Sequence, residues 1–264
     1  MKKRGQITIF VIVAILIVGV ILAFIFIKTS AEKEELGREY FQNQGLKPSL
    51  ANIQNFIIDC HEETSTRALI TIGIQGGYYN EPEYYFDMEW AFIPYYYYEG
   101  LQLMPTKTTI QQELSSYLDN NIQSCLDKIK FANFQVNYQQ PTTQTSIIES
   151  KAIFNTNQAF TIEHEGSTTN FELNQHPLTL ESSLNEIIEV ASFITTSHTE
   201  DPDLMCINCI TELAKERDLY VDFIAIEEDT TLVMILENRT LPEPYIFEFM
   251  NKYIVQEVTQ QPAE

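Results

Sequence analysis

Residues 93–100 read IPYYYYEG and place four consecutive tyrosines between two stretches of helical spacing. Side chains alternate along a strand, so one face of a strand here would receive Tyr95 and Tyr97. The opposite face would receive Tyr96 and Tyr98. One pair can pack against the helices while the other stays at the surface, because a tyrosine ring buries area while its hydroxyl remains hydrated. We therefore interpret the run first as packing.

The second interpretation of the run is a recognition surface for a glycan or a protein. Tyrosine and tryptophan supply rigid contact area for such surfaces. Segment 78–104 contains eight of the 14 tyrosines and the only tryptophan, and its prolines exclude a long helix. The candidate recognition surface consists of Tyr84, Tyr85, Trp90, Tyr95, Tyr96, Tyr97 and Tyr98.

A helical pattern with one cysteine flanks the aromatic segment on each side. Ser49 can cap a helix with Cys60 on its apolar side, and Gly76-Gly77 ends it, since glycine readily takes a positive φ. A second helix is predicted over 109–129 with Cys125 on its apolar side. Because both cysteines lie on packing faces, we expect a Cys60–Cys125 disulfide between the two helices.

From Phe134 the apolar period changes to two, which predicts strands. The expected strands FQVNY, SIIESKAIF, AFTIEHE and NFELNQH form an antiparallel meander. Helical spacing returns over 180–196 and 203–218, and three strand patterns close the chain. We predict an α+β fold with an N-terminal transmembrane helix, a helical pair with an aromatic insert, and an antiparallel β-sheet with further helices. The Tyr-rich helical subdomain spans 48–132, and the sheet subdomain with helices spans 133–264.

The N-terminal region indicates a membrane anchor. Residues 7–27, ITIFVIVAILIVGVILAFIFI, would span about 31 Å as a helix, close to the hydrocarbon thickness of a bilayer. The basic residues Lys2, Lys3 and Arg4 favour a cytoplasmic N-terminus, which places the rest of the chain outside the cell. We assign 1–28 to the cytoplasmic tip and transmembrane helix and 29–47 to a stalk.

Charge excludes one class of partner. The formal net charge is −21, and without the four basic residues of 1–28 the chain has 12 basic against 37 acidic residues, or −25. Such a surface repels nucleic acid and suits a solvated cell-surface domain.

Residues 2–10, KKRGQITIF, resemble the class III signal peptide of archaeal type IV pilin-like proteins. The resemblance covers residues 2–30 and implies that a prepilin peptidase cuts between Gly5 and Gln6 and leaves the apolar helix on the mature protein. Phe10 departs from the family, which usually has Glu there. The apolar replacement leaves no buried carboxylate to pair with a neighbouring amino terminus, which argues against filament assembly. The remaining chain resembles single-pass archaeal surface proteins.

Two further motifs carry candidate chemistry. Cys206-Ile207-Asn208-Cys209 is a C-x-x-C near a predicted helix start, which fits a local disulfide, a thiol–disulfide centre or half of a metal site. A strand before the motif, typical of redox folds, is missing. Asn238-Arg239-Thr240 is an N-glycosylation acceptor triplet.

The scattered histidines do not complete a metal site. In Glu163-His164-Glu165, strand alternation would point both glutamates to one face and the histidine to the other. No hydrolase or nucleotide-binding motif is present. We predict no catalytic residue, no metal and no cofactor.

We interpret the chain as a non-catalytic, membrane-anchored cell-surface protein with a structural or recognition role at the archaeal envelope. Its expected partners are the membrane, through residues 7–27, and an envelope glycan or another surface protein. One alternative is a pilin-like filament subunit that self-associates through the transmembrane helix. A second alternative is an extracytoplasmic thiol–disulfide oxidoreductase that uses Cys206 and Cys209.

Overall fold

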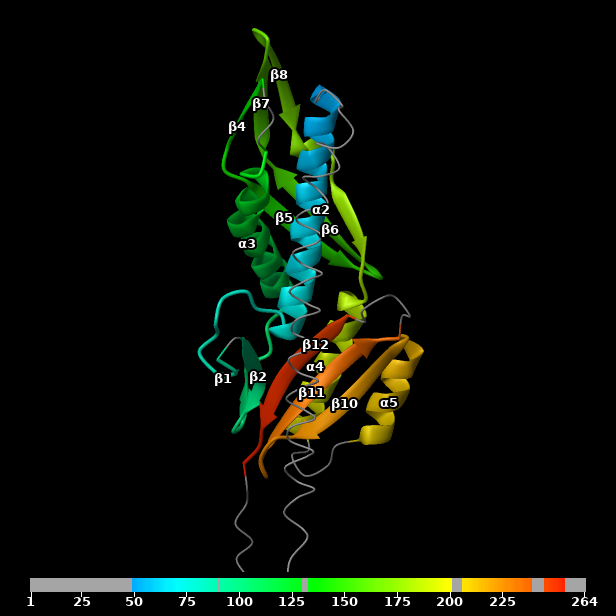
Figure 1. Ribbon diagram of the computed structural model, residues 1–264. Helices are drawn as coiled ribbons and strands as arrows, with labels where there is room; N and C mark the ends of the chain where they lie inside the picture. Colours follow the sequence, from blue (N-terminus) through cyan, green and yellow to red (C-terminus); the bar gives the residue numbers. More distant parts are fainter. Residues whose placement is uncertain (1–48, 90, 130–132, 201–205, 239–244, 255–264) are drawn as a thin grey trace, which may run out of the picture. The chain divides into compact units, whose positions relative to one another are not determined.

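The computed structural model describes residues 49–89, 91–129, 133–200, 206–238 and 245–254, and Figure 1 shows their arrangement. The helices are α2 (Leu50–Ile74), α3 (Lys107–Leu126), α4 (Leu184–Glu200), α5 (Ile207–Glu216) and the short 3₁₀ helix η1 (Leu173–Gln175). The first six strands are β1 (Tyr85–Asp87), β2 (Phe92–Tyr98), β3 (Leu101–Gln102), β4 (Phe134–Tyr138), β5 (Thr142–Ile148) and β6 (Lys151–Asn157). The other six are β7 (Ala159–His164), β8 (Ser167–Glu172), β9 (Leu178–Glu181), β10 (Leu219–Ala225), β11 (Thr230–Glu237) and β12 (Ile246–Lys252).

The helices α2 and α3 pack against each other along apolar faces. Both repeat aliphatic residues at spacings of three and four, which places them on one side of a helix. Thr106 caps α3, since its side chain accepts a hydrogen bond from the amide of Thr109. A disulfide between Cys60 and Cys125 joins the two helices, with their Cα atoms 5.7 Å apart. The fully buried apolar residues of this pair are Ile53, Ile57, Ala68, Ile72, Ile110, Leu114, Leu118 and Ile122.

The C-terminal end of α2 lies directly against β12. Gly76 and Gly77 have φ of +48° and +86°, and the Gly77 amide donates to the Ile72 carbonyl at 2.7 Å. This left-handed termination satisfies carbonyl groups that the last helical turn leaves open. A Cβ on Gly76 would lie 2.5 Å from the Glu248 carbonyl oxygen. Glycine is therefore required at this close approach of helix and strand.

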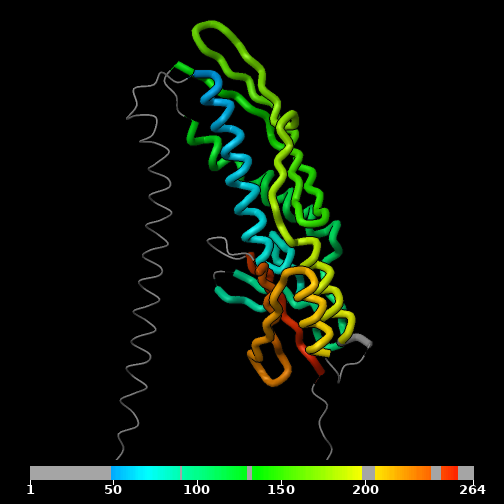
Figure 2. Tube along the Cα trace, turned by 90° about the vertical axis from the view of Figure 1, so that its right-hand side faces the viewer, coloured from blue at the N-terminus to red at the C-terminus, as the bar shows by residue number. Residues whose placement is uncertain are grey.

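The largest sheet has the order β1-β2-β12-β11-β10, with β3 also paired to β2. The strand pairs are antiparallel except β12 with β2, which is parallel. A register irregularity falls between Met250 and Asn251 in this parallel pair. In Figures 1 and 2, α4 and α5 lie on the same face of this sheet. The guanidinium of Arg217, which follows α5, lies 3.0 Å from the carboxylate of Glu189 in α4. This ion pair links the two helices.

Two three-stranded antiparallel sheets complete the described fold, with orders β4-β7-β8 and β5-β6-β9. Figures 1 and 2 place β4, β7 and β8 near the start of α2 and the largest sheet near its end. On β5 every second residue is buried, and two of these are Thr143 and Thr145. The hydroxyl of Thr143 bonds that of Thr156 at 3.0 Å, and the hydroxyl of Thr145 bonds that of Ser115 at 2.9 Å. These polar residues are stable in the core because each finds a partner.

The predicted fold class is wrong. Instead of one antiparallel sheet beside a helical pair, the described strands form three sheets. The aromatic segment supplies β1, β2 and β3 to the largest sheet and is not a separate insert. Among the described residues, no helix is long and apolar enough to cross a membrane. The helix predicted over 7–27 lies outside the described residues.

One local prediction also fails. The segment SIIESKAIF does not form one strand, because β5 ends at Ile148 and β6 begins at Lys151. Ser150 has φ of +57° in the tight turn between them. The Ser150 amide donates to the Glu186 carboxylate at 2.9 Å, and its carbonyl accepts from Ser182 at 3.1 Å. Tertiary hydrogen bonds thus stabilise a turn that the apolar pattern alone does not show.

Candidate functional site

The four consecutive tyrosines form most of β2, and two of them are buried. Tyr96 is 0% exposed, its ring stacks on Phe249 at 4.3 Å between centroids, and its hydroxyl donates to the Gly76 carbonyl at 2.9 Å. Burial, followed by the nearby Tyr78 and Tyr245, raises the Tyr96 pKa well above its usual value. Tyr97 is 6% exposed, and the centroid of its ring lies 5.9 Å from that of Tyr253.

The expected burial of an alternate pair, Tyr95/Tyr97 or Tyr96/Tyr98, is therefore wrong. Tyr96 and Tyr97 are neighbours and point to opposite faces of β2. Both faces of the strand are covered at this point, because Phe249 contacts one ring and Tyr253 the other. The other two, Tyr95 and Tyr98, are half-buried.

Three half-buried rings come together beside this buried pair, and we call Tyr84, Tyr95 and Tyr98 the tyrosine cluster. Ring centroids of Tyr84 and Tyr98 are 5.0 Å apart, and so are those of Tyr95 and Tyr98. The Tyr95 amide donates to the Tyr84 carbonyl at 3.1 Å, which fixes β2 against the residue preceding β1. The cluster therefore presents half-buried rings from a hydrogen-bonded strand backbone.

Charged groups border the tyrosine cluster. The Lys252 ammonium lies 5.2 Å from the Tyr98 ring centroid, a cation–π distance. Its Nζ also contacts Glu99 at 2.9 Å and Asp229 at 3.9 Å. The hydrogen bond to Glu99 is the main cause that raises the Lys252 pKa. Ring faces, an ammonium and two carboxylates thus converge at one place on the surface.

Tyr85 is a member of the predicted recognition surface that is not part of the tyrosine cluster. Tyr85 contacts Phe92 at 5.7 Å between centroids. Trp90 lies outside the described residues. The sequence does not identify Lys252 as a member of the site, because nothing near it in the chain indicates that β12 pairs with β2.

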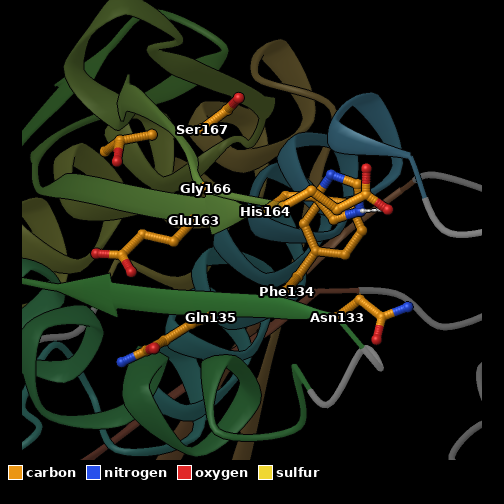
Figure 3. A pocket seen from close by; sticks show the side chains of 9 residues that line it. Asn133, Phe134, Gln135, Glu163, His164, Gly166 and Ser167 are labelled. Carbon is orange, nitrogen blue, oxygen red and sulfur yellow. Dashed lines mark ion pairs between the residues drawn. The ribbon is translucent and has the colours of Figure 1, made fainter.

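A hollow lies at the end of the β7–β8 hairpin, away from the tyrosine cluster (Figure 3). It is an open depression of about 520 Å³. The Phe134 ring stacks on the His164 imidazole at 4.0 Å. Figure 3 shows Glu163 pointing away from His164. The residues that line the depression are Asn133, Phe134, Gln135, Glu163, His164, Glu165, Gly166, Ser167 and Thr168.

The expected arrangement of Glu163-His164-Glu165 is only partly observed. Glu165 has φ of +48° and belongs to the turn, so its carboxylate comes within 4.0 Å of the His164 imidazole. One imidazole and one nearby carboxylate do not make a metal site. Within the described part of the chain, no group of three or more His, Cys, Asp or Glu side chains could hold a metal ion.

The imidazole of His61 is a polar group buried in the core. His61 of α2 is 1% exposed, and its Nε2 lies 3.0 Å from the Thr156 hydroxyl, which in turn contacts Thr143. Burial lowers the pKa of His61 to about 4, so this imidazole is neutral at neutral pH. Its role is to connect α2 with β5 and β6. The sequence gives no signal for it, because a polar residue beside Cys60 would be expected at the surface.

The four cysteines form two disulfides. Cys60 is buried and bonded to Cys125, the expected pair. Cys206 and Cys209 are bonded to each other at the start of α5, with their Cα atoms 5.3 Å apart. Asn238 is exposed after β11, and its side-chain amide donates to Asp218 at 3.3 Å. Glycosylation of Asn238 stays a prediction, and the processing residues Gly5 and Gln6 lie outside the described residues.

No protein-family model, curated protein or solved structure matches the chain.

Proposed function

We propose that the protein is a membrane-anchored cell-surface protein that recognises an envelope glycan through the tyrosine cluster. The observation that carries the proposal is the contact of Tyr84 and Tyr95 with Tyr98, with Lys252, Glu99 and Asp229 at its border. Half-buried rings offer apolar faces to the C–H side of a sugar. Carboxylates accept hydrogen bonds from sugar hydroxyls, and an ammonium donates to their oxygens.

The cluster is also pre-organised. Tyr96 and Tyr97, which lie between Tyr95 and Tyr98 in the chain, are anchored in the core. Their burial fixes the backbone that carries the accessible rings. Binding therefore requires little ordering of the protein, which preserves the free energy of the contacts.

Sequence features support the location. The apolar run 7–27 supplies the anchor, and the basic residues before it favour an exterior position for the rest of the chain. Two disulfides suit an oxidising compartment. The net charge of −21 disfavours acidic partners and favours a neutral or basic glycan.

Binding of the detergent-solubilised full-length protein to glycans extracted from the cell envelope tests the proposal. Tyr98→Ala removes the central ring and should weaken binding by at least about tenfold, or about 1.4 kcal/mol. Tyr220→Ala is the matched control, because Tyr220 lies on β10 and its side chain is 59% exposed. Two strands, β12 and β11, separate β10 from β2. The control should bind like the parent protein.

Two results would reject the proposal. Equal weakening in Tyr98→Ala and Tyr220→Ala would show that binding is not located at the cluster. Binding that depends on Tyr98 but involves another protein ectodomain instead of a glycan would keep the site and replace the ligand class. A melting temperature close to that of the parent protein must accompany the loss in Tyr98→Ala, so that the loss reflects contacts and not unfolding.

A further inference from the structure

The two disulfides occupy different environments. The Cys60–Cys125 disulfide joins two helices, and its cysteines are 65 positions apart in the sequence. Cys60 is buried. The Cys206–Cys209 disulfide closes a short ring between cysteines three positions apart in the sequence. Cys209 is exposed and Cys206 is half-buried. Loop-closure entropy grows with loop length, so the short ring constrains the unfolded chain less. Its position at the surface makes it accessible to another thiol.

The start of α5 places a backbone donor beside the sulfur of Cys206. Cys206 is the N-cap of α5, and its Sγ accepts a hydrogen bond from the Cys209 amide at 3.3 Å. The first turn of α5 carries no acidic side chain. Backbone donors and the helix dipole lower the pKa of a thiol in this position. Stabilisation of the reduced form makes a disulfide a stronger oxidant.

The helix also holds this position firmly. Ile210 and Ala214 are buried, so α5 is attached to the core along one side. At its other end, Arg217 Nε donates to Glu189 of α4 at 3.0 Å. Between the cysteines, Ile207 is 48% exposed and offers an apolar contact beside the sulfur atoms. An exposed disulfide with an apolar neighbour fits an extended cysteine-containing polypeptide as a partner.

We propose that Cys206–Cys209 is a redox site that oxidises dithiols of extracytoplasmic polypeptides. A partner thiolate attacks Sγ of Cys209, the more exposed residue of the pair, and the Cys206–Cys209 bond breaks. Cys206 leaves as a thiolate stabilised by the amide of Cys209. The partner's second thiolate then attacks the partner sulfur of the mixed disulfide and releases Cys209. Two electrons pass from the partner to the protein, and the products are a partner disulfide and the reduced Cys206/Cys209 dithiol.

The first test uses the full-length protein in detergent and a synthetic peptide with two reduced cysteines. One peptide disulfide should form for each protein molecule. Alkylation and mass spectrometry should then find Cys206 and Cys209 reduced and Cys60–Cys125 intact. The variants Cys206→Ser and Cys209→Ser should each abolish the oxidation. If the peptide stays reduced with the parent protein, or is oxidised equally by Cys209→Ser, the proposal is wrong.

The second test separates a tuned site from an ordinary accessible disulfide. After mild reduction, the rate of Cys206 alkylation is followed against pH in the folded protein and in a synthetic peptide with the sequence of residues 203–216. A thiolate stabilised by α5 should react at least about tenfold faster at pH 6 in the folded protein, since a pKa lower by one or more pH units raises the thiolate fraction. Identical pH profiles would overturn the assignment.

Discussion

The hydroxyl of Tyr96 donates a hydrogen bond of 2.9 Å to the carbonyl oxygen of Gly76, which joins β2 to the end of α2. Gly76 is also one of two glycines, with Gly73, whose lack of a Cβ lets the helix end approach β12. The two contacts together position β2, β12 and α2. The tyrosine cluster depends on this arrangement, because Tyr95 and Tyr98 flank the buried residues of the same strand.

Tyr96→Phe should lower the free energy of unfolding by about 1–2 kcal/mol, because it removes a buried donor and leaves the Gly76 carbonyl without it. Tyr96→Ala should lower it by about 3–5 kcal/mol, since a cavity is added. Urea unfolding measures both changes. Tyr95→Phe is the control and should stay within about 0.5 kcal/mol of the parent protein. Equal values for Tyr96→Phe and Tyr95→Phe would contradict the proposed role of the hydroxyl.

The Cys60–Cys125 disulfide should contribute more to stability than Cys206–Cys209. For the longer loop, chain entropy gives about 4 kcal/mol, against about 2 kcal/mol for the short ring. Unfolding of the double variants Cys60→Ala/Cys125→Ala and Cys206→Ala/Cys209→Ala tests this order. Peptide mapping without reduction should find Cys60 joined to Cys125. A peptide that joins Cys60 to Cys206 or Cys209 would refute the pairing.

Stability should fall as the pH is lowered through the range set by His61. Burial lowers the pKa of His61 to about 4 in the folded protein, whereas the unfolded value is 6.5. The unfolded state binds the proton first, so the loss begins below about pH 6.5 and is complete near pH 4. The full loss is about 3 kcal/mol for this residue.

The variant His61→Gln isolates this contribution, because it keeps a hydrogen-bonding side chain and does not titrate. Its unfolding free energy, measured between pH 7.5 and pH 4, should fall less steeply than that of the parent protein. His164→Gln is the matched control, since His164 is partly exposed in the β7–β8 depression. If His61→Gln and the parent protein have parallel profiles, His61 is not a neutral buried group.

The helices that carry the cysteines could be predicted because their apolar residues repeat locally. Ile53, Ile57 and Cys60 alone define one face of α2, whatever packs against it. The start of β5 could not be predicted in this way. Thr143 and Thr145 are buried only because Thr156 and Ser115 supply partners from other elements, and a polar residue in the sequence does not show its partner.

The site was harder to predict than the helices. Alternation describes how Tyr96 and Tyr97 leave β2, but it does not hold at Tyr98, whose ring lies 5.0 Å from that of Tyr95 between centroids. The choice of buried rings depends on what covers each face. Phe249 and Tyr253 come from the end of the chain, and the parallel pairing of β12 with β2 that brings them there leaves no local pattern. Lys252 reaches Tyr98 by the same pairing. A prediction from periodicity cannot include such contacts.

The mature chain should begin at Gln6 and keep the apolar run 7–27. This follows from the resemblance of residues 2–10 to a class III signal peptide, which is cut before the apolar segment. Mass spectrometry of the N-terminal peptide from isolated membranes measures it. A start near Glu32 would mean that an ordinary secretory signal had been removed, and the membrane-anchored proposal would then be wrong.

Gly76→Ala should be much more destabilising than Gly166→Ala, although both glycines have positive φ, +48° and +80°. A side chain in this backbone region costs about 1–2 kcal/mol by itself. At Gly166 no other atom would lie within 4 Å of an added Cβ. At Gly76 an added Cβ would lie 2.5 Å from the Glu248 carbonyl oxygen and 2.6 Å from the Pro94 ring.

Because Glu248 belongs to β12 and Pro94 to β2, relief of this clash must move α2 away from both strands. We expect a loss of about 3–4 kcal/mol for Gly76→Ala, as for other overpacked sites with backbone strain. The loss for Gly166→Ala should be about 1 kcal/mol, the cost of the backbone conformation alone. Glycan binding by Gly76→Ala should also weaken at a temperature where the variant is folded, since the strand that carries Tyr95 and Tyr98 shifts. Equal losses of stability in the two variants would show that the contact between α2 and β12 does not constrain the fold.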